Sequence, residues 1–212
     1  MPIRAMSRLG AALAVAAVSA ALLAAPGGGS APGAAARPYA TAPIPPRRMT
    51  ARRLEPRPQW AVARGTTVRS SDLFTDRVFA TASDGFALAS LSNAQFPACS
   101  HDAGRTWRTC GPAVHVDAAD GPEGVGHVGV AGPRTFFAYG SSAVDVTSDG
   151  GRTWWETFLG ELVVAVVSGP RNDLVAYVQQ QLTSNSLAAV TWQYVSRDRG
   201  RHWSYSHSLG GE

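Results

Sequence analysis

Three copies of one eight-residue pattern occur in the chain from residue 100 onward. They read SHDAGRTW at residues 100–107, TSDGGRTW at 147–154 and SRDRGRHW at 196–203, and we call them the first, second and third boxes. Their first residues are 47 and then 49 positions apart. A period of this size indicates a repeated structural unit rather than a single site.

The segments between the boxes have the composition of short β-strands. They are rich in β-branched and aromatic residues and are divided by turn signals such as GPRND and TSNS. We expect four strands in each unit, with the box between the third and fourth: 77–82, 85–91, 95–99 and 107–110; 126–131, 134–139, 143–147 and 154–159; 161–169, 173–181, 187–196 and 203–209. Residues 60–69 indicate one more strand, left from a preceding unit or used to close the array.

A repeat of this length that contains four strands is typical of a β-propeller blade. The sequence therefore predicts an all-β fold over residues 59–212, a β-propeller-like array of about three four-stranded antiparallel blades. Blades are stabilised mainly by their neighbours, so such an array is either partial or closed by a homo-oligomer.

The boxes resemble the Asp-box, also called the BNR repeat, whose pattern is Ser/Thr-x-Asp-x-Gly-x-Thr-Trp. Two boxes match it completely, and the third has His202 in place of Thr. From about residue 60 onward the chain is thus similar to the sialidase-like superfamily of Asp-box propellers, which includes sialidases, sortilin-type receptor domains and propeller-type photosystem II assembly factors. This resemblance implies a fold more strongly than any activity, because one fold hosts many functions.

The residue types of the boxes suit a turn between two outer strands. We expect each Asp to accept hydrogen bonds from N–H groups one or two residues on, and each Gly to adopt a positive φ. The hydroxyl groups are expected to bond across the loop, and the Trp rings to anchor between sheets. The residues with these structural roles are Ser100, Asp102, Gly104, Thr106, Trp107, Thr147, Asp149, Gly151, Thr153, Trp154, Ser196, Asp198, Gly200 and Trp203.

The alternative is that the three box Asp residues are catalytic or bind a metal. They belong to three separate units and so cannot converge, and in the resembling family the boxes lie away from the face that carries active sites. We therefore expect no catalytic, cofactor or metal role for them. Recognition is expected on the inter-strand loops away from the boxes.

A sialidase-like hydrolase is the competing enzymatic interpretation. The resemblance implies three Arg that hold a carboxylate, a Tyr nucleophile with a Glu, an Asp acid, and an Arg-Ile-Pro signature before the first box. The nearest string, APIPPRR, does not match, and three blades are fewer than the six of a closed sialidase. Nothing in the sequence selects a triad from Arg64, Arg69, Arg77, Arg134 and Arg171, and strand packing is the default for Tyr139, Tyr177 and Tyr194.

Cation sites have little support. Residues 116–124 place Asp117, Asp120 and Glu123 in one loop without the spacing of an EF-hand, which favours a solvated loop. The histidines show no metal-pair spacing, and a surface position is expected for His101 and His202: the five are His101, His115, His127, His202 and His207. We expect no cofactor.

The first 25 residues have the order of an export signal. Basic residues Arg4 and Arg8 precede the apolar run 11–25, and small residues follow it. The run is shorter than the roughly 20 residues of a membrane span, although an uncleaved anchor stays open. Cleavage near Ala25 or Ala36 is expected, and the protein is expected to be secreted or extracytoplasmic.

Residues 26–58 are rich in Pro, Ala, Gly and Arg, which predicts a disordered linker. The chain has eight Arg and one acid through residue 58, and 11 Arg and 14 acids after it. The repeat region is therefore mildly acidic, which gives no reason to expect nucleic-acid binding. The basic linker is either a solvated tail or a contact for anionic envelope polymers.

Two cysteines, Cys99 and Cys110, flank the first box. In an exported protein this placement favours a structural disulfide, with free thiols or a redox pair as alternatives. Taken together, these features predict an exported, non-enzymatic binding or scaffold protein with an unknown protein or glycan ligand. The alternatives are a sialidase-like glycosidase or its remnant, and an extracytoplasmic protein-assembly factor.

Overall fold

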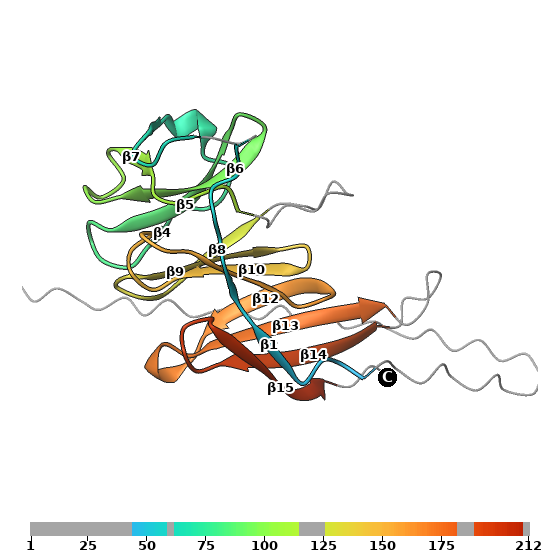
Figure 1. Ribbon diagram of the computed structural model, residues 1–212. Helices are drawn as coiled ribbons and strands as arrows, with labels where there is room; N and C mark the ends of the chain where they lie inside the picture. Colours follow the sequence, from blue (N-terminus) through green and yellow to red (C-terminus); the bar gives the residue numbers. More distant parts are fainter. Residues whose placement is uncertain (1–43, 59–61, 115–125, 182–188, 210–212) are drawn as a thin grey trace, which may run out of the picture. The chain divides into compact units, whose positions relative to one another are not determined.

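The computed structural model describes residues 44–58, 62–114, 126–181 and 189–209, all within the unit Ala40–Glu212 (Figure 1). In these ranges the chain is all-β, with three antiparallel sheets, two short 3-10 turns and no α-helix. Within this part of the chain no helix is long and apolar enough to cross a membrane. The expected signal segment 1–25 and residues 26–43 lie outside the described residues.

Each sheet contains four consecutive strands, at the positions that the repeat predicts. They are β4 (Val78–Phe79), β5 (Gly85–Leu91), β6 (Ala94–Ser100) and β7 (Trp107–Thr109) in the first sheet; β8 (His127–Gly132), β9 (Thr135–Gly140), β10 (Ala143–Thr147) and β11 (Trp155–Phe158) in the second; and β12 (Leu162–Ser168), β13 (Leu174–Gln181), β14 (Ala189–Ser196) and β15 (His202–Leu209) in the third. Every box joins the third strand of its sheet to the fourth. None of the three sheets closes on itself.

A fifth strand lies at the outer edge of each sheet. The additional strand expected within residues 60–69 is present as β3, whereas the sequence does not predict β1 and β2. β1 (Arg48–Thr50) pairs with β15, β2 (Arg52–Arg53) with β11, and β3 (Thr67–Val68) with β7. Figure 1 shows β1 in blue beside the red strand β15. We call residues 47–54 the strap, because this one segment pairs with both the third and the second sheets.

The prediction of a disordered linker is therefore wrong for the strap. The N–H of Ala51 donates to the carbonyl of Arg201 (2.8 Å), and the N–H of Leu54 donates to the carbonyl of Trp154 (2.9 Å). Leu54 is buried, and Met49 packs against the core. The strap is ordered because β11 and β15 would otherwise present edges of unpaired backbone donors and acceptors, which favour an added strand.

The core consists of side chains shared between neighbouring sheets. Phe86 of the first sheet stacks on Phe136 of the second, with ring centroids 5.2 Å apart. Phe137 and Val146 of the second sheet are buried in one cluster with Trp203 of the third. A third cluster lies on the face of the first sheet that points away from the second sheet. It contains Val68, Ala87, Ala89, Ala98 and Trp107. Successive sheets therefore bury their apolar faces against each other.

Candidate functional site

The three boxes close by the same set of hydrogen bonds. In the first box the Ser100 hydroxyl donates to the Asp102 carboxylate (2.8 Å) and accepts from the N–H of Gly104 (2.9 Å). The corresponding distances are 2.8 and 2.9 Å from Thr147 and 3.0 and 2.8 Å from Ser196. Each first-position hydroxyl thus bonds both to the Asp and to the turn of its own loop.

The Asp residues reach further along the loop than the sequence suggests. Asp102 accepts from the N–H of Thr106, Asp149 from that of Thr153, and Asp198 from that of His202, each at 2.9 Å. Each Asp carboxylate therefore accepts from the backbone N–H four residues later in the chain. The expectation of a donor one or two residues later is wrong. The intervening residues turn back on themselves, with positive φ at Gly104 (81°), Gly151 (88°) and Gly200 (86°).

These hydrogen bonds favour the charged carboxylates. The backbone and side chain of Thr106 both donate to Asp102 and hold its pKa at about 2. Burial opposes the charge of Asp149, but hydrogen bonds from Thr153 and Thr147 outweigh it and lower its pKa. The charge of each box Asp is thus stabilised inside its own loop.

His202 takes over the role that Thr has in the other boxes. Its Nδ1 contacts the Asp198 carboxylate, as the Thr106 hydroxyl contacts Asp102 (2.7 Å). Burial would raise the pKa of Asp198, but hydrogen bonds from His202 and Ser196 lower it. As expected, the His202 side chain is exposed, yet it still completes the loop.

The Trp rings fix the boxes to the sheets. The indole N–H of Trp107 donates to the carbonyl of Gly104 (3.0 Å), and that of Trp203 donates to the carbonyl of Gly200 (3.1 Å). The second box differs, because the indole of Trp154 donates to the carbonyl of Cys110, which follows the first sheet (3.3 Å). The second box is therefore bonded directly to its neighbouring unit.

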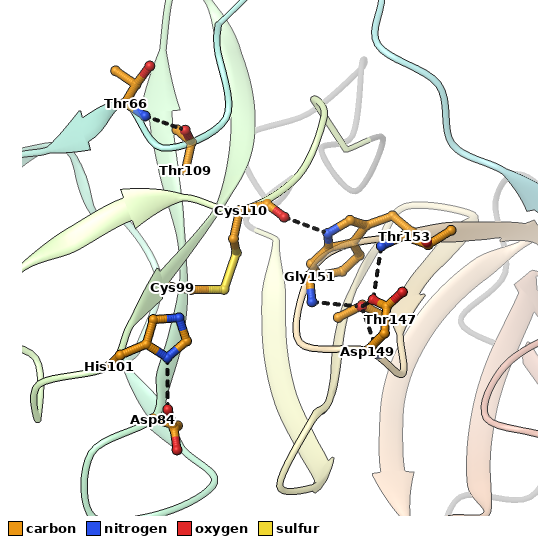
Figure 2. Close-up of a disulfide and its surroundings, with 11 residues drawn as sticks. Thr66, Asp84, Cys99, His101, Thr109, Cys110, Thr147, Asp149, Gly151 and Thr153 are labelled. Atoms are coloured by element: carbon orange, nitrogen blue, oxygen red, sulfur yellow. Dashed lines mark hydrogen bonds and ion pairs between the residues drawn. A yellow bond between two sulfur atoms is a disulfide. The ribbon is translucent and has the colours of Figure 1, made fainter.

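The predicted disulfide is present. Cys99 at the end of β6 is bonded to Cys110 after β7, with Cα atoms 5.7 Å apart (Figure 2). It encloses the first box and lies where Gly151 of the second box approaches the first sheet.

A groove opens beside this disulfide, between the first and second boxes. It has a volume of about 510 Å³, and its lining includes Cys99, His101 and Gly150. A second hollow of about 410 Å³ shares His101, Gly150 and Arg64 with it and extends to the β8–β9 turn. We call the two hollows together the arginine groove.

Four separate segments contribute arginines to the arginine groove. Two guanidinium groups bond only to backbone: Arg108 donates to the carbonyl of Gly65 (3.1 Å), and Arg134 to that of Asp149 (3.3 Å). The other two have no hydrogen-bond or ion-pair partner among the described residues. These four are Arg64, Arg108, Arg134 and Arg152.

The carboxylates that line the arginine groove are bonded elsewhere. Asp102 and Asp149 are held in their boxes. Asp84 accepts from the Thr81 hydroxyl (2.7 Å) and lies 2.8 Å from Nδ1 of His101 (Figure 2). Hydrogen bonds from His101 and Thr81 lower the pKa of Asp84. Within the described ranges, no ion pair joins these carboxylates to the arginines.

This arrangement suits binding better than bond cleavage. Guanidinium groups offer paired donors to carboxylate or phosphate oxygens. The His101–Asp84 pair resembles two members of a triad, but in the described part of the chain no Ser, Thr or Cys side chain bonds to the His101 ring. The groove can therefore hold an anionic group in place.

The other predicted candidates do not converge here. Arg69, Arg77 and Arg171 do not line the groove, whereas Arg64 and Arg134 do. Tyr194 is buried in the core, and burial raises its pKa to about 12. Within the described ranges no three His, Cys, Asp or Glu side chains form a metal cluster. The acidic loop 116–124 lies outside the described residues.

The sequence signal for the arginine groove is weak, because its arginines are scattered along the chain. Recognition on the face away from the boxes remains a prediction, and two of the connecting segments lie at 115–125 and 182–188, outside the described residues.

The chain matches no protein family model, no curated protein and no solved structure.

Proposed function

We propose that this protein is an exported, non-enzymatic binding or scaffold protein built from three Asp-box blades of a partial β-propeller. The phase of the boxes and the four consecutive strands of each sheet support the blade assignment. Each box Asp is bonded within its own loop, which supports a structural role for the repeats rather than a chemical one.

The arginine groove is the observation that carries the binding function. Arg64 and Arg152 come from different segments, line the same hollow, and have no ion pair among the described residues. Residues 59–212 carry more acids than arginines, so unneutralised guanidinium groups gathered there require an explanation. The ligand class that they fit is a carboxylate or phosphate group of a glycan or envelope polymer.

An extracytoplasmic location belongs to the same proposal. The Cys99–Cys110 disulfide supports it, because disulfides persist in oxidising compartments. Not every arginine of the basic segment is available to bind anionic polymers, because Arg52 in the strap forms an ion pair with Glu156.

Sialidase-type hydrolysis is the second candidate, and one observation favours it. Arg64, Arg134 and Arg152 line one hollow, which is the chemistry of a carboxylate clamp. However, no Tyr is among the described residues that line the arginine groove, so the structure gives no support there for the nucleophile that the resemblance implies. A fluorogenic sialoside tests this directly, and turnover by the purified protein would overturn the non-enzymatic assignment.

Calorimetric titration tests the binding function. The probes are a carboxylated oligosaccharide and, separately, inorganic polyphosphate, which distinguish the two sources of anionic oxygen. We expect one of them to bind with an affinity that falls as salt rises, and Arg64→Ala/Arg152→Ala to weaken it at least about tenfold. Arg77→Ala/Arg197→Ala removes the same charge at exposed positions outside the groove and is the matched control. Equal losses in both variants, or no binding of either probe, would refute the groove as the ligand site.

A further inference from the structure

One face of the third sheet carries large apolar side chains that no described element covers. Four of the seven exposed large hydrophobic residues in the described part of the chain belong to it: Leu162 (50% exposed), Val164 (42%), Val167 (45%) and Leu209 (41%). On β12 a β-bulge between Val163 and Ala165 interrupts the alternation, and Val163 and Val166 on either side of it are buried against the second sheet. The exposed set therefore marks the opposite face, which we call the open face.

The strand register extends the open face across all four repeat strands. Val175 pairs with Val167 on one side and with Val195 on the other, and Tyr177 pairs with Gln193. On the four repeat strands, none of these paired positions is Asp, Glu, Lys or Arg: Leu162, Gln179, Thr191 and Leu209; Tyr177, Gln193 and His207; Val167, Val175, Val195 and Ser204. The fifth strand, β1, adds the exposed Arg48 at the edge of this face, where it pairs with Ser204. A solvated sheet face is normally polar, whereas depletion of charge is typical of an interface core.

The same positions form the sheet-to-sheet interfaces in the other two units. Cys99 directly precedes the first box and pairs with Phe86, and both are buried in one cluster with Trp154. Val146 directly precedes the second box and pairs with Phe137, and both are buried with Trp203. The third-sheet equivalents are Val195 and Val175, which are only partly buried. The open face is thus the third-sheet equivalent of the surfaces that pack between neighbouring sheets, and no described element covers it.

The far end of the array is different, because the chain covers it. The reverse face of the first sheet presents the small residues Ala87, Ala89 and Ala98, each 0% exposed. They form one cluster with Val68 and Trp107, against which Leu73 packs. A head-to-tail contact would require that end to accept the open face of the next copy. Among the described residues, the first sheet therefore offers no uncovered end that could receive the open face of another copy.

We infer that the open face binds the open face of a second copy and forms a two-fold symmetric dimer. Because the repeat strands carry no charged residue at the paired positions of this face, two copies can meet there with like-charge repulsion confined to Arg48 at the edge. A two-fold interface uses the same patch on both subunits. About a dozen side chains is roughly half of a standard interface, so the expected dimer dissociates in the micromolar range. This contact is independent of the arginine groove.

Analytical ultracentrifugation of the full chain over about 1–200 µM tests the inference. We expect a reversible shift from monomer to dimer mass. Val164→Glu/Val167→Glu places charges on the open face, and we expect it to weaken dimerisation at least about tenfold. Both side chains are more than 40% exposed in the monomer, so this variant should keep the parent circular dichroism spectrum. Ile44→Glu, at an 86% exposed residue outside the open face, is the matched control.

A cysteine variant tests the same contact without depending on added charge. The chain has no free cysteine among its described residues, so Val175→Cys introduces one thiol at the centre of the face. A short bis-maleimide should link it into a covalent dimer, whereas Ile44→Cys should remain monomeric. A monomer at every concentration, a dimer that the Glu variant leaves unchanged, or an open series of larger oligomers would each overturn the inference.

Discussion

Gly151 of the second box stands so close to Cys110 that a β carbon on Gly151 would lie 2.8 Å from the Cys110 carbonyl oxygen. That oxygen also accepts the indole N–H of Trp154 (3.3 Å). The second box therefore forms a turn within its own sheet and also contacts the end of the first sheet at Cys110 (Figure 2). Gly200 of the third box approaches Val146 of the second sheet in the same way.

From this contact we predict that Gly151→Ala lowers the free energy of unfolding by more than the positive φ of residue 151 alone would explain. Gly160 has the same φ of +88° but nothing within 4 Å of an added β carbon, so Gly160→Ala is the matched control. We expect Gly160→Ala to cost about 1 kcal/mol for the positive φ, and Gly151→Ala about 1–3 kcal/mol more for overlap with Cys110. Urea unfolding measures both, and equal losses would show that the close approach has no energetic consequence.

Removal of the disulfide should destabilise the first unit. The bond joins residues 11 positions apart, and the entropy of closing such a loop corresponds to about 2–3 kcal/mol. Cys99→Ala/Cys110→Ala should lower the free energy of unfolding by at least that amount. Reduction of the parent protein should have a similar effect, and reductant should not affect the variant. An unchanged free energy of unfolding after reduction would contradict the role assigned to the bond.

The strap should depend on its contact with a buried carboxylate. Nη2 of Arg52 lies 2.5 Å from the Glu156 carboxylate, whose side chain is 0% exposed. Arg52→Met should lower the free energy of unfolding by about 1–3 kcal/mol, because it takes away a cationic partner of a buried charge. Arg48→Met changes an exposed strap residue and should cost under about 0.5 kcal/mol. If both variants lose the same amount, the ion pair does not hold the strap.

Acid should weaken the fold through the box carboxylates. Hydrogen bonds from Thr106 hold the pKa of Asp102 at about 2, below its usual 3.8, and the pKa values of Asp149 and Asp198 are also lowered. A carboxyl with a lowered folded-state pKa contributes its full stability above about pH 4 and loses it as the pH falls toward 2. Urea unfolding at pH 5, 4, 3 and 2 should show this decline, and Asp102→Asn should make it shallower. A flat profile below pH 4 would be inconsistent with charged box loops.

The repeat strands and the box turns were predictable because their signals are local. A hydroxyl, an Asp, a Gly and a Trp at fixed offsets encode one turn, and the flanking β-branched runs encode its strands. The strap was not predictable in this way. Arg52 and Arg53 have no strand pattern of their own, and their conformation depends on the edge of β11, more than 100 residues later.

The arginine groove depends on the same kind of long-range contact. Arg64, Arg134 and Arg152 are far apart in the sequence, and only the packing of the first two units brings them to one hollow. The role of Trp154 was equally hidden, because its box matches the pattern completely while its indole bonds to the neighbouring unit. The periodicity of the sequence predicts the strands and turn within each repeat. The candidate site lies between two repeats, so the periodicity does not predict it.

The most direct test of this account is the free energy of unfolding of Asp149→Ala, measured beside its anion binding. Asp149 accepts from the Thr147 hydroxyl (2.8 Å) and from the N–H of Thr153 (2.9 Å), and its removal leaves both donors without this acceptor. We predict a loss of about 2 kcal/mol in stability, with anion binding in the arginine groove no weaker than in the parent. Unchanged stability together with lost binding would show that the box Asp acts on the ligand, and would contradict its structural role.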